Sequence, residues 1–124
     1  MSDELEPGEG TADEREILVQ VYRDFNARHI GAVLARMHPS VDWPNGMEGG
    51  RVHGHDEVAD YWTRQWKIVD PHVTPVGIEP DEDGRMVVRV HQVVRDLEGK
   101  VLVDQTVYHA YKFVGGLIAR MDIE

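Results

Sequence analysis

The chain has 124 residues, of which 41% are hydrophobic and 29% are charged, and its formal net charge at pH 7 is −10. This length is enough for one domain with a hydrophobic core. The acidic balance argues against a nucleic-acid partner, because phosphate binding depends on clustered Lys and Arg. The sequence has no cysteine, which excludes disulfides, thiolate nucleophiles and sulfur-ligated metal sites. No apolar run approaches the roughly 20 residues of a membrane span, so we expect a cytoplasmic protein with no membrane partner.

The N-terminal third predicts a tail followed by two helices. Residues 1–12 are expected to form a disordered acidic tail, because they contain few apolar side chains and do not resemble a signal peptide. A capping-box pattern, Thr followed three residues later by Glu, then starts a predicted helix over 13–28 whose apolar residues repeat at helical spacing. A second helix is expected over 31–38, ended by Pro39.

The middle of the chain predicts a short strand, a loop and a third helix. The strand is expected over 41–44, and the loop over 45–54 contains four glycines. The third helix is expected over 56–67, with acidic side chains near its start, where the helix dipole favours negative charge. A further strand is expected over 73–79.

The last forty residues, 85–124, are expected to form a three-stranded antiparallel meander. Asp83-Gly84, Glu98-Gly99 and Gly115-Gly116 are typical hairpin turns, and the runs between them are rich in Val, Ile, Tyr and Phe. The element order predicts an α+β fold with the helices grouped against one face of an antiparallel sheet. Because the other face also carries apolar residues, we predict a homodimer through this outer sheet face.

One set of alternate positions in the meander carries a few polar side chains among many apolar ones. An apolar face with convergent polar groups is typical of a pocket wall, so we predict that this face lines a ligand cavity. The positions are Val87, Arg89, His91, Val93, Val101, Val103, Gln105, Val107, His109, Tyr111 and Phe113.

Three motifs, together with the element order, resemble the SnoaL-like branch of the nuclear transport factor 2-like superfamily, which includes ketosteroid isomerases and limonene epoxide hydrolases. The motifs are Arg51-Val52-His53-Gly54-His55, Val58-Ala59-Asp60-Tyr61-Trp62 and Tyr111-Lys112-Phe113-Val114-Gly115-Gly116-Leu117-Ile118. The resemblance makes residues 13–124 a single domain. It implies a cone-shaped α+β barrel, in which three N-terminal helices pack on a curved, mainly antiparallel sheet around a largely apolar cavity, commonly as a dimer.

The resemblance to ketosteroid isomerases is partial. It places Tyr22 where those enzymes have a helix-one tyrosine that donates a hydrogen bond to the developing oxyanion, and it places His109 where they have a protonated aspartate. Their general base is an aspartate directly before a proline. Here Trp43 holds that position and Asp42 lies one residue earlier. Because a shift of one residue moves a strand side chain to the other face, ordinary ketosteroid isomerisation is not expected.

Two other branches of the superfamily match in part. Arg89-Val90-His91 resembles the Arg-x-Asp pair of the epoxide hydrolases, with histidine in place of the acid. The polyketide cyclases use a histidine and an aspartate as acid and base in the cavity, and His91 and His109 keep half of that pattern. Neither branch supplies a complete set of catalytic carboxylates in this chain.

The candidate catalytic residues are His91 and His109 as acid–base groups, Tyr22 as an oxyanion donor and Arg89 as a binder of a carboxylate, phenolate or enolate. The alternative is that these four are polar core residues that bond to each other and to water. The candidate ligand-binding residues are Trp43, Asp42, Trp62, Trp66, Gln105 and Val107, although the tryptophans also suit an ordinary core. No metal is expected, because His53 and His55 have no third ligand at a motif spacing.

Two functions remain open from the sequence. The first is a cofactor-independent acid–base enzyme (isomerase, cyclase or hydrolase) acting on a small polyketide-, terpenoid- or steroid-like molecule. The second is a non-catalytic dimer of the same fold that binds a ligand or a protein. The missing general-base aspartate favours the second function, and the group of Arg, Tyr and two His favours the first.

Overall fold

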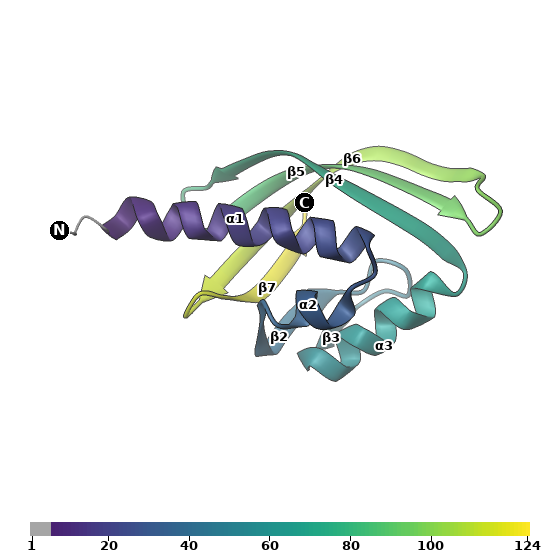
Figure 1. The fold of residues 1–124 in the computed structure, drawn as a ribbon, viewed down its shortest axis with the longest axis horizontal. Helices are drawn as coiled ribbons and strands as arrows, with labels where there is room; N and C mark the ends of the chain where they lie inside the picture. Colours follow the sequence, from purple (N-terminus) through teal and green to yellow (C-terminus); the bar gives the residue numbers. More distant parts are fainter. Residues whose placement is uncertain (1–5) are drawn as a thin grey trace.

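In the computed structural model, which describes residues 6–124 with side chains from Asp13 onward, three helices pack on one face of a six-stranded sheet (Figure 1). This arrangement confirms the predicted α+β fold. The elements are α1 (Glu6–Asn26), α2 (Ile30–Leu34), β2 (Met37–Pro44), β3 (Arg51–His53), α3 (Gly54–Trp66), β4 (Val69–Pro80), β5 (Met86–Asp96), β6 (Val101–Val114) and β7 (Leu117–Ile123).

Helix α1 lies across the inner face of the sheet (Figure 1). Its buried side chains Leu18, Val21 and Tyr22 follow the expected i, i+3, i+4 spacing. The helix begins at Glu6, seven residues before the expected start, so residues 6–12 of the predicted tail form its first turns. The rest of the tail prediction falls on residues 1–5, which lie outside the described residues. Asn26 fixes the C-terminal end of α1 to β4, since its side chain exchanges two hydrogen bonds of 2.8 and 2.9 Å with the backbone of Val73. Among the described residues, no helix is long and apolar enough to cross a membrane.

The second helix is shorter than predicted, and a strand takes its place. Helix α2 ends at Leu34, and β2 already begins at Met37, where it pairs in parallel with β7. The Ile118 N–H donates to the Arg36 carbonyl over 2.9 Å at the start of this pairing. The register is irregular between Met37 and Asp42. Pro39 lies in that irregular part because it has no N–H to donate to a neighbouring strand.

The glycine-rich segment after β2 closes a hairpin where the sequence predicts only a loop. Strand β3 pairs antiparallel with β2, with Val52 opposite Trp43. The turn is held by Asn45, whose N–H donates to Gly50 (3.0 Å) and whose carbonyl accepts from Gly49 (2.9 Å). The third helix follows at Gly54, two residues before its predicted start.

The C-terminal meander of β5, β6 and β7 is confirmed, and its glycine turns have the positive φ angles that glycine tolerates, as at Gly84 (82°) and Gly99 (96°). The strand order is β3-β2-β7-β6-β5-β4, and only the β2–β7 pair among the described strands is parallel. The helices cover one face of this sheet and leave the other, the outer face of β4, β5 and β6, uncovered (Figure 1).

The pairing of β5 with β6 corrects the predicted face. Val88 lies opposite His109, and Val90 lies opposite Val107. Each pair joins an even-numbered residue of β5 to an odd-numbered residue of β6, so the odd positions of the two strands point to opposite faces. The inner face of β5 therefore carries Val88 and Val90, both 0% exposed, while Arg89 and His91 lie on the outer face.

An aromatic cluster forms the centre of the core below helix α1. Trp62 of α3 is 2% exposed and packs edge-on against Trp43 of β2 and Phe25 of α1, with ring centroids 5.6 and 5.2 Å apart. Tyr111 of β6 contacts Trp43 from the other side, at 6.2 Å. These rings connect the helices to the sheet and surround one end of the cavity described next.

Candidate functional site

A cavity of about 440 Å³ lies between the helices and the inner face of the sheet. This volume is in the usual range of small-molecule sites. Its walls are mostly aliphatic and aromatic side chains, including Trp43, Trp62 and Val107. Among the described residues, none of the lining side chains is Asp, Glu, Lys or Arg. The polar lining residues are Tyr22, Tyr61, Gln65, Gln92, Gln105, His109 and Tyr111.

Three of these polar side chains form a buried chain of hydrogen bonds. The Tyr111 hydroxyl lies 2.8 Å from the Tyr22 hydroxyl, which in turn lies 2.8 Å from Nδ1 of His109. Helix α1 provides Tyr22, and alternate positions of β6 provide His109 and Tyr111. All three are buried, with exposed fractions of 1% for Tyr111, 3% for Tyr22 and 7% for His109.

One order of the protons along this chain of hydrogen bonds gives every buried hydroxyl donor an acceptor. If Tyr111 donates to Tyr22, then Tyr22 donates to Nδ1 of His109, and every buried hydroxyl proton has an acceptor. In the reverse order, the proton of Tyr111 would be buried without a partner among the described residues. An unsatisfied buried donor costs about 1–3 kcal/mol, so the order from Tyr111 to Tyr22 to His109 is favoured.

This order fixes what His109 presents to a ligand. Because Nδ1 accepts from Tyr22, a neutral His109 carries its proton on Nε2. Nε2 has no hydrogen-bond partner in the described part of the chain, and the ring lines the cavity. The Nε2–H group is thus a donor available to a molecule in the cavity.

Burial keeps all three groups of the chain neutral at physiological pH. It lowers the pKa of His109 to about 4, because the imidazolium would lose its hydration. It also raises the pKa of Tyr111, and it raises that of Tyr22 well above 10, with Tyr111 adding to the increase for Tyr22. Hydrogen-bond donation from the neutral Nε2–H is therefore the chemistry that this group offers near pH 7.

Arg89 and His91 do not join this group, so their predicted convergence with Tyr22 and His109 is wrong. Both are exposed on the outer face of β5. There His91 Nε2 lies 2.7 Å from a carboxylate oxygen of Asp104, and the Arg89 side chain lies along Gly77 of β4. The physical reason is the strand register, which pairs even positions of β5 with odd positions of β6.

Comparison with protein families gives a match to the SnoaL-like domain over residues 18–121. The chain belongs to the SnoaL-like domain family. A comparison with curated proteins gives no match at the sequence level. The family match confirms the resemblance that the sequence motifs indicated.

Several solved structures share the fold of this SnoaL-like domain. TerC, crystallised with polyporic acid, is 25% identical, and the match covers 90% of both chains with a TM-score of 0.78. A protein from Burkholderia pseudomallei K96243, described as nuclear transport factor 2-like and of unknown function, is 24% identical over 90% of this chain and 89% of its own (TM-score 0.78). A Sinorhizobium meliloti protein, provisionally named a polyketide cyclase, is 19% identical over 88% of this chain and 94% of its own (TM-score 0.74).

The predicted ligand-binding residues divide into two groups. Trp43, Trp62, Gln105 and Val107 line the cavity of this SnoaL-like domain. Trp66 does not line it, because it packs behind Trp62 on the side where the guanidinium of Arg28 covers its ring at 4.8 Å.

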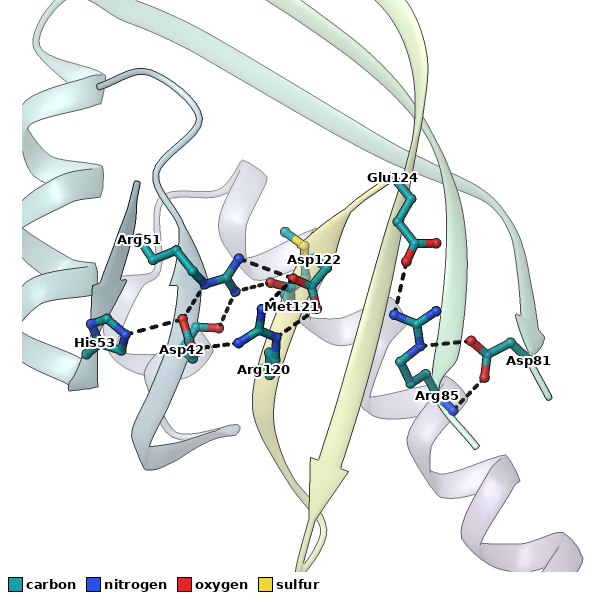
Figure 2. Close-up of polar contacts among 9 residues, drawn as sticks. All are labelled: Asp42, Arg51, His53, Asp81, Arg85, Arg120, Met121, Asp122 and Glu124. Carbon is teal, nitrogen blue, oxygen red and sulfur yellow. Dashed lines mark hydrogen bonds and ion pairs between the residues drawn. The ribbon is translucent and has the colours of Figure 1, made fainter. Parts of the chain in front are cut away.

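Asp42 lies outside the cavity in a cluster of ion pairs (Figure 2). Its carboxylate is bonded to Arg51 and, over 2.7 Å, to Arg120, and it lies 3.4 Å from His53. Asp42 and Trp43 are neighbours on one strand, so the tryptophan that lines the cavity directs the aspartate to the opposite face. The prediction that Asp42 contacts a ligand in the cavity is therefore wrong.

The histidines of the Arg51–His55 motif do not form a metal site. His53 faces Asp42, and Nε2 of His55 lies 2.9 Å from the Met37 carbonyl oxygen. Within the described residues, no group of three His, Cys, Asp or Glu side chains has the geometry of a metal site.

Tyr111 was placed on the predicted cavity face without a role, and Gln92 was not predicted to line the cavity. Tyr111 shares the face of His109 at two-residue spacing, and this alternation was the available signal, but its hydroxyl partner on α1 requires the tertiary structure. Gln92 reaches the cavity through the register of β5 with β6, where it lies opposite Gln105.

Proposed function

We propose that this protein binds a small, largely apolar molecule in its cavity, with a hydrogen bond from Nε2–H of His109 to an acceptor oxygen of the ligand. The carrying observation is the ordered chain from Tyr111 through Tyr22 to His109, which holds one donor in an otherwise uncharged, mostly apolar cavity. The similarity to TerC, which was crystallised with polyporic acid, supports a small organic ligand. A polyketide-, terpenoid- or steroid-like skeleton suits the aromatic walls.

A catalytic role of the same site is the second candidate, and the same donor favours it. A fixed N–H group in a dry cavity stabilises negative charge that develops on a substrate carbonyl oxygen, as isomerases and cyclases require. Acid–base catalysis also needs a base. Nδ1 of His109 accepts a hydrogen bond from Tyr22 and Nε2 carries a proton, so neither ring nitrogen is free to act as the base. The described lining also holds no carboxylate. Binding is therefore the function that the geometry supports best.

Two substitutions of His109 test the donor. Asparagine places an acceptor near Nδ1 and loses the Nε2–H group, whereas glutamine places a donor near Nε2 and loses the acceptor for Tyr22. With flavone as a flat, neutral probe that carries a carbonyl oxygen, we expect His109→Asn to weaken binding about 10-fold, since one hydrogen bond is lost. We expect His109→Gln to bind flavone more tightly than His109→Asn does. Isothermal titration calorimetry gives the dissociation constants.

Val107→Trp is the control for binding in the cavity, because the larger side chain fills space between His109 and Gln105 on β6. It is expected to abolish flavone binding while the protein stays folded by circular dichroism. Flavone binding that survives this substitution, or no binding to the parent protein, would contradict the proposed function. Binding that is weakened by glutamine and not by asparagine would show that His109 acts only through its bond to Tyr22.

We also propose that two copies associate through the outer face of β4, β5 and β6. This face is more polar than expected, because Arg89 and His91 lie on it and not on the cavity side. Tyr108 (44% exposed) lies on it, opposite Arg89 in the pairing of β5 with β6. Tyrosine and arginine are enriched at protein interfaces, and the helices leave this face uncovered (Figure 1).

A charge at the centre of this face tests the association. Light scattering at micromolar concentration is expected to give twice the chain mass of 14.1 kDa for the parent and one chain mass for Tyr108→Glu. The matched control is Val19→Glu, which places the same charge at an exposed apolar position of α1, away from the sheet, and should stay dimeric. A monomeric parent would rule out this interface.

A further inference from the structure

Two glutamines form a second polar group in the cavity, at its entrance. Gln92 of β5 and Gln105 of β6 lie opposite each other in the sheet, and Nε2 of Gln105 donates to Oε1 of Gln92 over 2.9 Å. Both side chains line the cavity. Gln105 is exposed and Gln92 is half-buried, so the pair is accessible from solvent and from within.

The pair presents one donor and one acceptor to the cavity. Its internal hydrogen bond uses one N–H and one carbonyl oxygen, which leaves the Gln92 amide nitrogen and the Gln105 carbonyl oxygen without partners among the described residues. If both amides are turned over, the roles exchange, and one donor and one acceptor still remain. A hydroxyl group matches this arrangement, because it donates and accepts at the same atom.

The glutamine pair is well separated from His109. Gln105 lies four positions before His109 on β6, which is about 13 Å along a strand. The segment between them presents Val107 to the cavity, and Val73 of β4 and Phe25 of α1 also line it. The two polar ends are therefore joined by an apolar passage.

The lining also selects against charge. Every ionic side chain that was predicted to reach the cavity lies elsewhere, with Arg89 on the outer face and Asp42 in the ion-pair cluster of Figure 2. An ion that enters the apolar passage would lose its hydration without meeting an opposite charge, which is strongly unfavourable. Neutral hydrogen-bonding groups at both ends suit a neutral ligand.

We propose that the cavity recognises an uncharged, elongated molecule by both of its ends, a carbonyl-type oxygen at His109 and a hydroxyl at the Gln92–Gln105 pair. Its polar groups would lie on the order of 10 Å apart, with an apolar and preferably flat skeleton between them. This inference rests on the proposed function, since it specifies the ligand of the same cavity. It assigns the selection of the hydroxyl end to two residues that play no part in the chain of Tyr111, Tyr22 and His109.

Four flavones that differ at the 4′ position test this assignment. Flavone has hydrogen there, and the others carry a hydroxyl, a methoxy or a carboxylate group at the end remote from the ring carbonyl. For the parent protein at neutral pH, the hydroxyl compound is expected to bind about 10-fold more tightly than flavone, because it gains two hydrogen bonds. The methoxy compound, which only accepts, should gain less, and the carboxylate should bind at least 10-fold more weakly than flavone.

The matched variant is Gln92→Met with Gln105→Met, since methionine keeps the length of glutamine and removes its polar atoms. In this double variant, the hydroxyl compound is expected to bind no better than flavone, so that the roughly 10-fold preference of the parent is lost. A hydroxyl preference that persists in the double variant would overturn the inference, as would carboxylate binding as tight as hydroxyl binding. Either result leaves the proposed function standing, because that function fails only if flavone does not bind in the cavity, as judged with Val107→Trp.

Discussion

Replacing Arg51 by methionine is expected to lower the free energy of unfolding by about 2–3 kcal/mol, which is a large part of the stability of a small domain. Arg51 of β3 is the centre of the ion-pair cluster in Figure 2. Its guanidinium donates to the carboxylates of Asp42 and Asp122 and to the backbone carbonyls of Asp42 and Met121. One side chain thus joins β3, β2 and β7.

The cost arises mainly from the two aspartates that Arg51 would leave behind. The side chains of Asp42 and Asp122 are only 23% and 27% exposed. Partial burial alone raises the pKa of Asp42, but the bond and charge of Arg51, followed by the charges of Arg120 and His53, lower it overall. The pKa of Asp122 is lowered first by its bond to Arg120 and further by the charge of Arg51. Without Arg51, two half-buried carboxylates would share the single guanidinium of Arg120.

Arg64→Met provides the matched control. Arg64 pairs with Glu48 over 2.9 Å, but both side chains are about half exposed, and exposed pairs contribute only about 0–1 kcal/mol. Urea unfolding followed by circular dichroism measures both variants. Equal, small losses for Arg51→Met and Arg64→Met would show that the cluster of Figure 2 is an ordinary surface network.

The position of Arg51 explains how the motif from Arg51 to His55 contributes to the fold. Arg51 bonds to Asp42, which is next to the cavity residue Trp43, and to Met121, which itself lines the cavity. The cluster therefore holds the outside of the wall whose inner side lines the cavity. The motif from Arg51 to His55 marks the fold through this clamp rather than through the chemistry of the site.

The sequence predicted the elements whose signals are local. The spacing of Leu18, Val21 and Tyr22 identified the core face of α1, and the glycine turns located the meander. The strands that were missed or shortened depend on distant partners. Strand β2 begins at Met37 because β7, some eighty residues later, pairs with it, and no local pattern carries that information.

The site was half predicted for a related reason. Tyr22 and His109 meet as the resemblance implied, but Arg89 and His91 were assigned to the cavity by counting alternate positions across the β5–β6 hairpin. That count assumes a register, and the pairing is irregular between Val94 and Arg95, next to the turn. A change of one residue in register exchanges the two faces of a strand. Periodicity within β6 was reliable, and periodicity across the turn was not.

His109 is expected to make the domain less stable as the pH falls from about 6.5 to about 4. Its pKa in the folded protein is about 4, because burial disfavours the charged ring, whereas an unfolded chain gives the ordinary value of about 6.5. Between these values the unfolded state binds more protons than the folded state. The free energy of unfolding therefore rises with pH in this window and falls on acidification, by about 3 kcal/mol in all. Below pH 4 both states are protonated and the effect stops growing.

His109→Asn isolates this contribution, because asparagine keeps an acceptor for Tyr22 and does not titrate. Protonation of His109 would also place a proton on Nδ1, which would force Tyr22 to accept and leave the Tyr111 hydroxyl proton buried without a partner among the described residues. Tyr22 and Tyr111 stay neutral throughout the window, and the other titrating groups are the same in both proteins. The stability difference between parent and variant should thus shift by about 3 kcal/mol, to the disadvantage of the parent, between pH 7 and pH 4. Parallel stability curves, measured by urea unfolding at each pH, would mean that the ring of His109 is hydrated in solution and that its Nε2–H does not face a dry cavity.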